Sequence, residues 1–201
     1  METTATQPRR RSIGARRNPQ TETAIIEAAR ELLADRGYAG FSIEEAARRA
    51  GAGKATVYRW WPTKADLFMA VYEAEKAHAI SLPDTGSLVE DLVWHCTEIW
   101  RFWRTHPAGG AFRALLAEAQ ASEAAGRRLR NEFIPVLFRP VRHLFERAAA
   151  RGEFPAQLID ERIALWAGFN WYHLLTWQIE ADEALLRRIE TLVASGGNGA
   201  G

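Results

Sequence analysis

The chain has 201 residues, of which 47% are hydrophobic and 25% charged, a composition that supports a buried core and excludes a disordered chain. Its single cysteine cannot form an internal disulfide, and its arginine-rich start lacks the apolar segment of a signal peptide, so we expect a cytoplasmic protein. The charge-free run from Ile163 to Trp177 is too short and too polar to cross a bilayer, so no membrane partner is expected.

Charge is unevenly distributed along the chain. Residues 1–64 hold 12 Lys/Arg and 7 Asp/Glu, whereas residues 65–201 hold 14 Lys/Arg and 18 Asp/Glu. A basic first third on a chain whose net charge is only +1 indicates that one end meets a polyanion. A solvated basic tail is the alternative.

The hydrophobic pattern is helical throughout. Ala, Leu, Glu and Arg dominate the periodic segments and no alternating pattern occurs, so the sequence predicts an all-α fold. Four N-terminal helices are expected: one from Asn18-Pro19 to Gly37, one in a capping box after Ser42, one over 54–61, and one from Thr63 to about Ile80. Pro62 ends the third helix because proline lacks a backbone donor.

A turn cluster at residues 83–86 separates these helices from a longer C-terminal body. Further helices are predicted from Ser87, in a second capping box, to His106, and over 111–120, 122–151, 160–179 and 182–194, with a break at Pro107 and Gly109-Gly110 and kinks at Pro135 and Pro140. The expected organisation is a disordered basic arm (1–17), a helix-turn-helix domain (18–62), a connecting helix (63–82), a helical regulatory and dimerisation domain (83–195) and a disordered tail (196–201).

The segment AGAGKATVYRWWPTK, residues 50–64, has the form of a helix-turn-helix, whose second helix enters the DNA major groove. At about 100° per residue, Val57 and Trp61 fall on one face and point to the core. The opposite face carries Ala55, Thr56 and Arg59. Arg59 can reach guanine O6 and N7, Thr56 can donate or accept a hydrogen bond, and Ala55 can touch a thymine methyl group.

Phosphate contacts are expected around this base-reading face. Lys54, Tyr58 and Lys64 lie at its edges, and both Ser42 and Lys64 stand at helix N-termini, where free N–H groups favour an anion. Trp60 can donate its indole N–H to a phosphate oxygen. The basic arm adds Arg16 and Arg17. Alternatively, Tyr58 and Trp60 cover the edge of the core, and Lys64 is an ordinary solvated charge.

The segment FSIEEAARRAGAGKATVYRWWPTKADLFMAV, residues 41–71, with the preceding IIEAARELLADRGYAGFS, resembles the N-terminal DNA-binding domain of TetR-family transcriptional regulators. The resemblance implies DNA contacts at the matching positions, which are Ser42, Lys54, Thr56, Tyr58, Trp60 and Lys64. Two positions depart from the family pattern. Gly53 replaces a frequent serine and removes a phosphate contact, and Trp60 replaces a frequent histidine with a neutral donor.

The resemblance also implies that the C-terminal body holds a ligand. The body is rich in aromatic residues, and aromatic walls with a few polar anchors suit a planar or bulky apolar molecule. The candidate ligand-binding residues are Trp94, His95, Trp103, Phe112, Glu118, Phe138, Trp166, Asn170 and His173. An ordinary aromatic core, with its polar groups satisfied by neighbours, is the alternative.

A homodimer is expected because a helix-turn-helix protein gains affinity from two half-sites related by its own two-fold axis. The resemblance implies that the helices over 160–179 and 182–194 form the interface. The segment DERIALWAGFNWYHLLTW is apolar nearly all round, and the candidate interface residues are Leu165, Ala167, Gly168, Trp171, Leu185 and Ile189. A purely intramolecular core helix would have a similar pattern.

The sequence therefore predicts a DNA-binding transcriptional regulator, a homodimeric repressor that a small apolar or aromatic ligand releases from a palindromic double-stranded operator. A regulator that activates transcription, or acts through a protein partner without a ligand, is the alternative. An enzyme is not expected, because the sequence has no HExxH, GxSxG, glycine-rich phosphate loop or paired-cysteine motif. No cofactor or metal is expected, since His95 and Glu98 alone form an incomplete metal site.

Overall fold

The computed structural model describes residues 18–180 and 182–196, and every regular element within these ranges is helical, which confirms the all-α prediction. The N-terminal helices are α1 (Pro19–Gly40), α2 (Ile43–Arg49), α3 (Lys54–Trp60) and α4 (Lys64–Ala79). The body contains α5 (Leu88–Thr105), α6 (Pro107–Glu118), α7 (Glu123–Arg128), the π-helical η1 (Leu129–Phe133), α8 (Ile134–Leu137), α9 (Arg139–Ala150), the short 3₁₀ helix η2 (Ala156–Leu158), α10 (Ile159–Leu175) and α11 (Glu183–Ser195).

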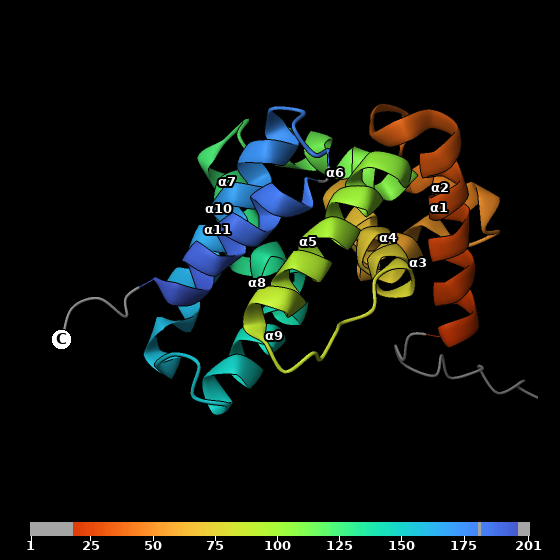
Figure 1. Ribbon diagram of the computed structural model, residues 1–201. Helices are drawn as coiled ribbons and strands as arrows, with labels where there is room; N and C mark the ends of the chain where they lie inside the picture. The colour runs from red at the N-terminus through yellow and green to blue at the C-terminus, as the bar shows by residue number, and fades with distance from the viewer. Residues whose placement is uncertain (1–17, 181, 197–201) are drawn as a thin grey trace, which may run out of the picture.

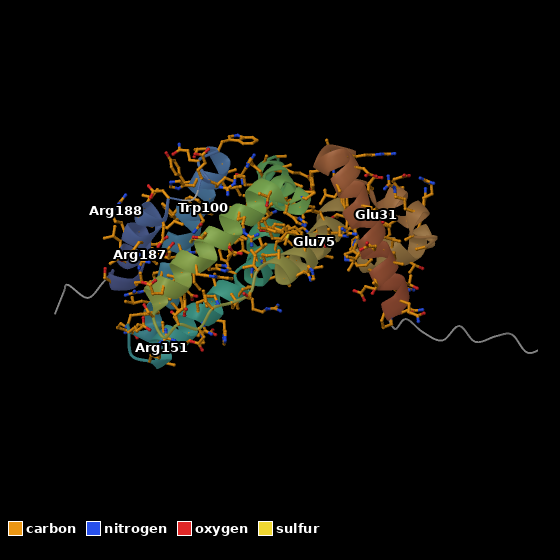
Figure 2. The ribbon with its side chains drawn as sticks, turned by 45° about the vertical axis from the view of Figure 1, so that its right-hand side comes forward. Glu31, Glu75, Trp100, Arg151, Arg187 and Arg188 are labelled. Carbon is orange, nitrogen blue, oxygen red and sulfur yellow. The ribbon has the colours of Figure 1, made fainter. Side chains whose placement is uncertain are left out.

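The two groups of helices occupy opposite ends of the molecule. Figure 1 shows α1 to α4 at one end, α10 and α11 at the other, and α5 running between them. Figure 2 shows the same division, with Arg187 and Arg188 at the α11 end and Glu31 at the α1 end. The predicted arm over 1–17 and residues 197–201 of the predicted tail lie outside the described residues.

Helices begin where side chains can cap them. At several helices the side chain of the N-cap residue accepts a hydrogen bond from an N–H of the first turn. Such caps are Asn18 of α1, Ser42 of α2, Thr63 of α4, Ser87 of α5 and Asp182 of α11. Among the helices described, only α4 begins with a reciprocal capping box, formed by Thr63 and Asp66. The boxes predicted at Ser42 and Ser87 are one-sided, because Glu45 pairs with Arg48 and Glu90 pairs with Arg187.

The predicted helix end at Gly37 marks a sharp change of direction. Gly37 has φ 61° and ψ −175°, values that glycine adopts readily, and α1 resumes for one short turn up to Gly40. The predicted apolar stripe of α1 is buried, since Ile25, Ala29, Leu32 and Leu33 are at most 2% exposed. The kink therefore directs the chain toward α2 without uncovering the core.

The predicted helix end near His106 is confirmed, because α5 ends at Thr105, but the break does not extend over Gly109-Gly110, because α6 already begins at Pro107 and not at 111. Pro107 occupies the first turn, where its missing N–H costs nothing, and the His106 ring Nδ1 accepts from the Ala108 N–H at 3.3 Å. A Cβ placed on Gly109 would lie 2.2 Å from the Phe102 carbonyl oxygen of α5. Glycine at this position therefore permits a close helix approach and does not signal a turn.

The helix predicted over 122–151 is divided, as its two prolines predicted. The chain passes from α7 through η1 to α8 and α9, with Pro135 and Pro140 in the first turns of the last two. No side chain of α7 is buried, η1 buries Leu129 and Phe133, and α8 buries only Leu137. Three buried side chains therefore hold the segment from α7 to α8, and α7 itself has none.

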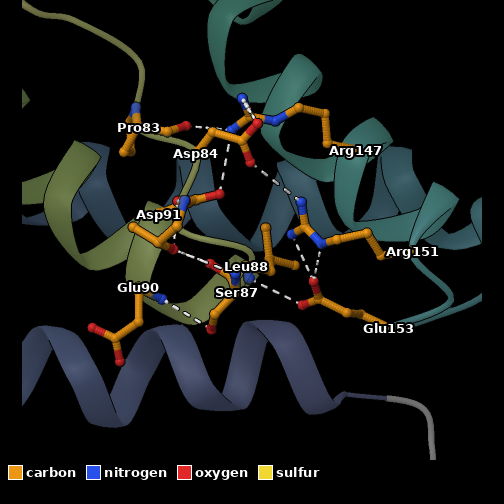
Figure 3. A network of polar contacts seen from close by, with 10 residues as sticks. Pro83, Asp84, Ser87, Leu88, Glu90, Asp91, Arg147, Arg151 and Glu153 are labelled. Atoms are coloured by element: carbon orange, nitrogen blue, oxygen red, sulfur yellow. Dashed lines mark hydrogen bonds and ion pairs between the residues drawn. The ribbon is translucent and has the colours of Figure 1, made fainter.

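The predicted turn at 83–86 is attached to α9 by a network of polar contacts (Figure 3). Asp91 is completely buried, and its Oδ1 accepts from the Thr85 N–H at 2.9 Å and from the Thr85 hydroxyl at 2.8 Å. Arg147 of α9 donates to the Pro83 carbonyl oxygen and to Asp91 Oδ2, at 3.3 Å for the latter. The connection between α4 and α5 is thus fixed by paired charges in the body.

Candidate nucleic-acid interface and interior cavity

The helix α3 has one buried and one exposed face. Val57 is completely buried and Trp61 is 4% exposed, which confirms that both face the core. Gly51, in the turn before α3, has φ 63°, a left-handed conformation that favours glycine. The residues that α3 leaves accessible are Lys54, Ala55, Tyr58 and Arg59, which are exposed, and Thr56, which is half-buried.

A carboxylate stands beside this exposed face. The Tyr58 hydroxyl donates to Glu44 of α2. This hydrogen bond, with a contribution from Lys54, lowers the pKa of Glu44, and it raises the pKa of Tyr58. Sequence reasoning did not single out Glu44, which places a negative charge next to residues expected to meet phosphates.

Trp60 and Lys64 both pack on aromatic rings. Trp60 is half-buried and meets Trp61 edge-on, with ring centroids 5.8 Å apart and planes at 78°. Lys64 Nζ lies 4.2 Å from the centroid of the Tyr38 ring, a cation–π arrangement that leaves its N–H groups able to donate elsewhere. Ser42 is half-buried and caps α2. The predicted contacts Arg16 and Arg17 lie outside the described residues.

The body binds the first turn of α4 through Arg128 of α7. Arg128 Nη1 donates to Thr63 Oγ1 at 2.6 Å, and its Nη2 forms an ion pair with Asp66. Burial acts to raise the pKa of Asp66, but the hydrogen bonds from Arg128 and Thr63 outweigh it and hold the pKa below its usual range. The capping box that starts α4 is therefore shared with the body.

Two further pairs join the N-terminal helices to the body. The Tyr38 hydroxyl of α1 donates to Glu118 Oε2 of α6 at 2.9 Å, and burial and this bond raise the pKa of Tyr38. Nε2 of His106, at the end of α5, lies 2.8 Å from Oε2 of Glu75 on α4. Glu118 is exposed and also lines a cavity of about 130 Å³ at this junction, so its expected place in the aromatic interior is wrong.

The aromatic interior exists but is nearly filled. A cavity of about 20 Å³, lined by Trp103, Phe112, Phe138, Trp166 and Trp171 among others, lies between α4, α5, α6, α8 and α10. The rings of Trp103 and Phe112 are almost parallel, at 12° and 6.1 Å between centroids. A space of this size holds about one water molecule. Five of the predicted ligand-binding residues therefore line this cavity: His95, Trp103, Phe112, Phe138 and Trp166.

Three polar side chains reach the same cavity, and they are Tyr72, Lys76 and His95. Lys76 Nζ pairs with Glu73 Oε1 at 2.7 Å and donates to the Leu137 carbonyl oxygen at 3.3 Å. Burial lowers the pKa of Lys76, and burial together with the Lys76 charge lowers the pKa of His95 to about 4, so His95 is neutral at pH 7.

Sequence reasoning missed Tyr72 and Lys76 as cavity residues, although the helical period contains a signal for them. Phe68, Tyr72 and Lys76 are spaced four residues apart on α4, so the lysine continues an apolar stripe. Both Tyr72 and Lys76 are buried, as that stripe requires. A lysine in line with core aromatics was therefore the available indication.

The remaining predicted ligand residues lie elsewhere. Trp94 is 36% exposed, so its expected interior position is wrong. Asn170 is buried, but its Oδ1 accepts from Trp100 Nε1 at 2.6 Å and its Nδ2 donates to the Trp166 carbonyl oxygen at 2.8 Å. His173 is half-buried and stacks on Trp100 at 5.1 Å between centroids. Neither Asn170 nor His173 lines the cavity in the aromatic interior.

A buried acid lies at the contact between α5 and α11. Glu190 of α11 is completely buried, and its Oε1 accepts from the Cys96 thiol at 3.0 Å, while Oε2 has no hydrogen-bond partner. Burial raises the pKa of Glu190 to about 7. Trp166 Nε1 donates to the Cys96 sulfur at 3.1 Å, which connects this acid to the aromatic interior.

The helices α10 and α11 leave an apolar face uncovered. Large side chains that are at least 50% exposed are Leu165, Tyr172 and Leu175 on α10, Leu192 on α11, and Trp177 just after α10. Among the predicted interface residues, Leu165 and Gly168 are exposed, Trp171, Leu185 and Ile189 are half-buried, and Ala167 is buried within its own chain. Within its own chain, the run from Ile163 to Trp177 is therefore buried on one side only.

Two classes of site are not found in the described ranges. No helix within residues 18–180 and 182–196 is long and apolar enough to span a membrane. The same residues contain no group of three or more His, Cys, Asp or Glu side chains that could hold a metal ion.

Comparison with known proteins matches both halves of the chain to the same kind of regulator. Residues 25–71 match the bacterial regulatory proteins of the tetR family, and residues 82–193 match the tetracyclin repressor-like C-terminal domain. An uncharacterized HTH-type transcriptional regulator of Bacillus subtilis, YdeS, is 31% identical over 175 residues, which cover 87% of this chain and 88% of that protein.

Two further similarities extend over most of the chain. The DNA-binding transcriptional repressor TetR of Mycobacteroides abscessus is 28% identical over 177 residues, covering 86% of this chain and 91% of that protein. The crystal structure of the TetR family transcription regulator SCO0332 matches with a TM-score of 0.74 and 23% identity, over 88% of this chain and 98% of that one. The last comparison shows a shared fold.

Proposed function

The chain belongs to the TetR family of helix-turn-helix transcriptional regulators, and on this premise we propose that it is a homodimeric repressor of a palindromic operator, released by a small molecule. Membership of this family identifies a DNA-binding regulator and not an enzyme. The repressor sign, the dimer and the release by a ligand are the proposed part. The relative from Mycobacteroides abscessus, a repressor by name, favours the repressor sign.

The exposed face of α3 carries the proposal. Val57 and Trp61 hold this short helix against the core, which leaves Ala55, Thr56 and Arg59 on the accessible side. Arg59 suits a bidentate contact with guanine, and Thr56 and Ala55 suit a neighbouring base pair. Lys54, Tyr58 and Lys64 at its edges, together with Ser42 and Trp60, suit the phosphates.

The exposed apolar face on α10 and α11 supports a homodimer. Large apolar patches on a soluble chain usually mark an interface, and two copies of one face can meet across a two-fold axis. Leu165, Tyr172, Leu175 and Leu192 would then be covered by the partner. Such a dimer would present two copies of α3, one for each half-site.

The contacts of α4 support release by a ligand. Arg128 and Glu118 join the body to Thr63, Asp66 and Tyr38, so a shift of α6 or α7 would move the start of α4 and with it α3. A different spacing of the two copies of α3 would no longer match grooves about 34–36 Å apart. A hundredfold loss of operator affinity requires the ligand to prefer the released form by about 2.7 kcal/mol.

Fluorescence anisotropy over a salt series tests the DNA contacts, using DNA from the region upstream of the gene and scrambled DNA. We expect Arg59→Ala to weaken binding to the specific DNA by about 10- to 100-fold, since one bidentate base contact contributes about 1–3 kcal/mol. Arg101→Ala on α5, an exposed arginine of the body paired with Glu98, is the matched control and should bind as the unaltered protein does. Equal losses in both variants would contradict the proposal.

The nearly filled interior favours a second candidate function. A regulator that acts through a protein partner needs no cavity, and the aromatic interior leaves only about 20 Å³. This alternative predicts that no small molecule raises the melting temperature or changes operator affinity, whereas the repressor proposal predicts both effects from one compound.

A further inference from the structure

We propose that the effector is an organic anion with a planar apolar body, and that Lys76, His95 and Tyr72 bind its charged group. This inference rests on the effector-released function proposed above and adds the chemical class of the ligand. It comes from three polar groups that meet inside an otherwise apolar enclosure.

Each of the three groups has hydrogen-bonding capacity to spare. The Tyr72 oxygen accepts from Trp103 Nε1 at 2.9 Å, which leaves the Tyr72 proton to be donated. Nδ1 of His95 is buried without a partner, and it donates in the tautomer that carries its proton there. Lys76 has three N–H bonds and spends two of them, on Glu73 and on the Leu137 carbonyl oxygen. Three donors around one apolar space match the acceptor oxygens of a carboxylate.

The charges around the cavity favour an anion over a cation. Lys76, whose side chain is 8% exposed, is the charged residue among those lining the cavity, and no acidic side chain lines it within the described part of the chain. The counter-charge, Glu73, stands outside the lining and is 26% exposed, so it can turn to water when a ligand replaces it. A cation in this space would face the Lys76 ammonium at low dielectric constant.

The walls favour a flat molecule. Trp103 and Phe112 lie nearly parallel, and Tyr72 stacks on Phe112 with centroids 4.7 Å apart and planes at 26°. Trp166 and Trp171 complete the enclosure beside Phe138. Stacked and edge-on contacts with such rings favour an aromatic guest over a branched aliphatic one.

The ligand must open the cavity, and its charged group acts on the wall that can move. A cavity of about 20 Å³ is far below the roughly 300–1,000 Å³ of ordinary ligand pockets. Leu137 and Phe138 form one wall, in the sparsely anchored segment that follows η1. An anion that draws Lys76 away from the Leu137 carbonyl oxygen releases the tie between α4 and this wall. The same segment leads back to Arg128, which holds the first turn of α4.

A charge series of probes tests the inference by isothermal titration calorimetry. Benzoate, 2-naphthoate and anthracene-2-carboxylate are each compared with the neutral amide and with the aminomethyl cation of the same ring. We expect at least one carboxylate to bind at least tenfold more tightly than its amide, with the cation weakest. Tenfold corresponds to about 1.4 kcal/mol. Equal or tighter binding of the amides or cations, or no binding of any carboxylate, would overturn the inference.

Two variants of opposite effect locate the charged group. Lys76→Met keeps an unbranched side chain of similar length and removes the charge, so the preference for carboxylate over amide should disappear. Glu73→Gln removes the competing partner of Lys76 and should tighten carboxylate binding several-fold, and this variant keeps the test decisive if Lys76→Met fails to fold. Unchanged carboxylate affinity in Glu73→Gln, or a preserved preference in Lys76→Met, would contradict the assignment.

Operator anisotropy with the same probes separates this inference from the proposed function. If amides or cations release the operator and carboxylates do not, the ligand class is wrong while the effector-released repressor stands. If the protein does not bind specific DNA in the absence of any probe, the proposed function fails whatever the calorimetry shows.

Discussion

Replacing Gly109 with alanine tests the close approach of α5 and α6. The new Cβ would lie 2.2 Å from the Phe102 carbonyl oxygen and 2.7 Å from both the Phe102 carbonyl carbon and Trp103 Cα, all of them backbone atoms. Alanine gains about 0.5–1 kcal/mol over glycine inside a helix, whereas overpacking costs about 1–3 kcal/mol. Because backbone cannot rotate away, we expect the upper end of that cost and a net loss of about 2 kcal/mol in the free energy of unfolding.

Gly110→Ala is the matched control, one residue further along α6. The nearest atom to its Cβ would be the Trp103 carbonyl oxygen at 4.0 Å, so this variant should gain about 0.5–1 kcal/mol without a clash. For a chain of this length 1 kcal/mol shifts the melting temperature by about 2–4 °C, so the two variants should differ by roughly 5–10 °C at one protein concentration. Calorimetric midpoints that coincide would refute the close-approach reasoning.

Three further substitutions test other parts of the structure. Glu44→Gln removes a negative charge beside the DNA face and should raise operator affinity about two- to fivefold by anisotropy; unchanged affinity would argue that Glu44 stands away from the phosphates. Burial raises the pKa of Glu190 from 4.5 to about 7, so the stability that its proton provides is complete below pH 4.5 and is lost as the pH rises to 7. Glu190→Gln should therefore be more stable than the unaltered protein at pH 8 by about 1–3 kcal/mol and should lack this pH dependence in urea denaturation; parallel pH profiles would contradict this. Leu175→Glu combined with Leu192→Glu should give a monomer by light scattering, and a persistent dimer would place the interface elsewhere.

Features that depend on neighbouring residues in the chain could be predicted from the sequence. Asn18, Ser42 and Thr63 start helices because each cap needs only an N–H two or three residues away. Val57 and Trp61 are buried because the period of α3 assigns them to one face. The exposed face of α3 was therefore predictable as a set of residues, although its contact with Glu44 was not.

Features that depend on which helices meet could not be predicted in this way. Gly109 has the sequence signature of a turn, and only the position of the α5 backbone shows why glycine is needed there. Glu190 and Asp91 are charged residues on helices, and their burial follows from packing by α5 and α9. Trp94 is 36% exposed although its type favours the core, because at about 100° per residue it lies on the face of α5 opposite the buried Trp103.

The residues that join the body to α1 and α4 are separate from those that α3 leaves exposed. Arg128 holds Thr63 and Asp66, and Glu118 holds Tyr38, whereas Thr56 and Arg59 take part in neither tie. In the proposed repressor, operator preference and effector response can consequently change independently during evolution. A copy of this gene could acquire a new target site through a few substitutions on α3 while keeping the signal to which it responds.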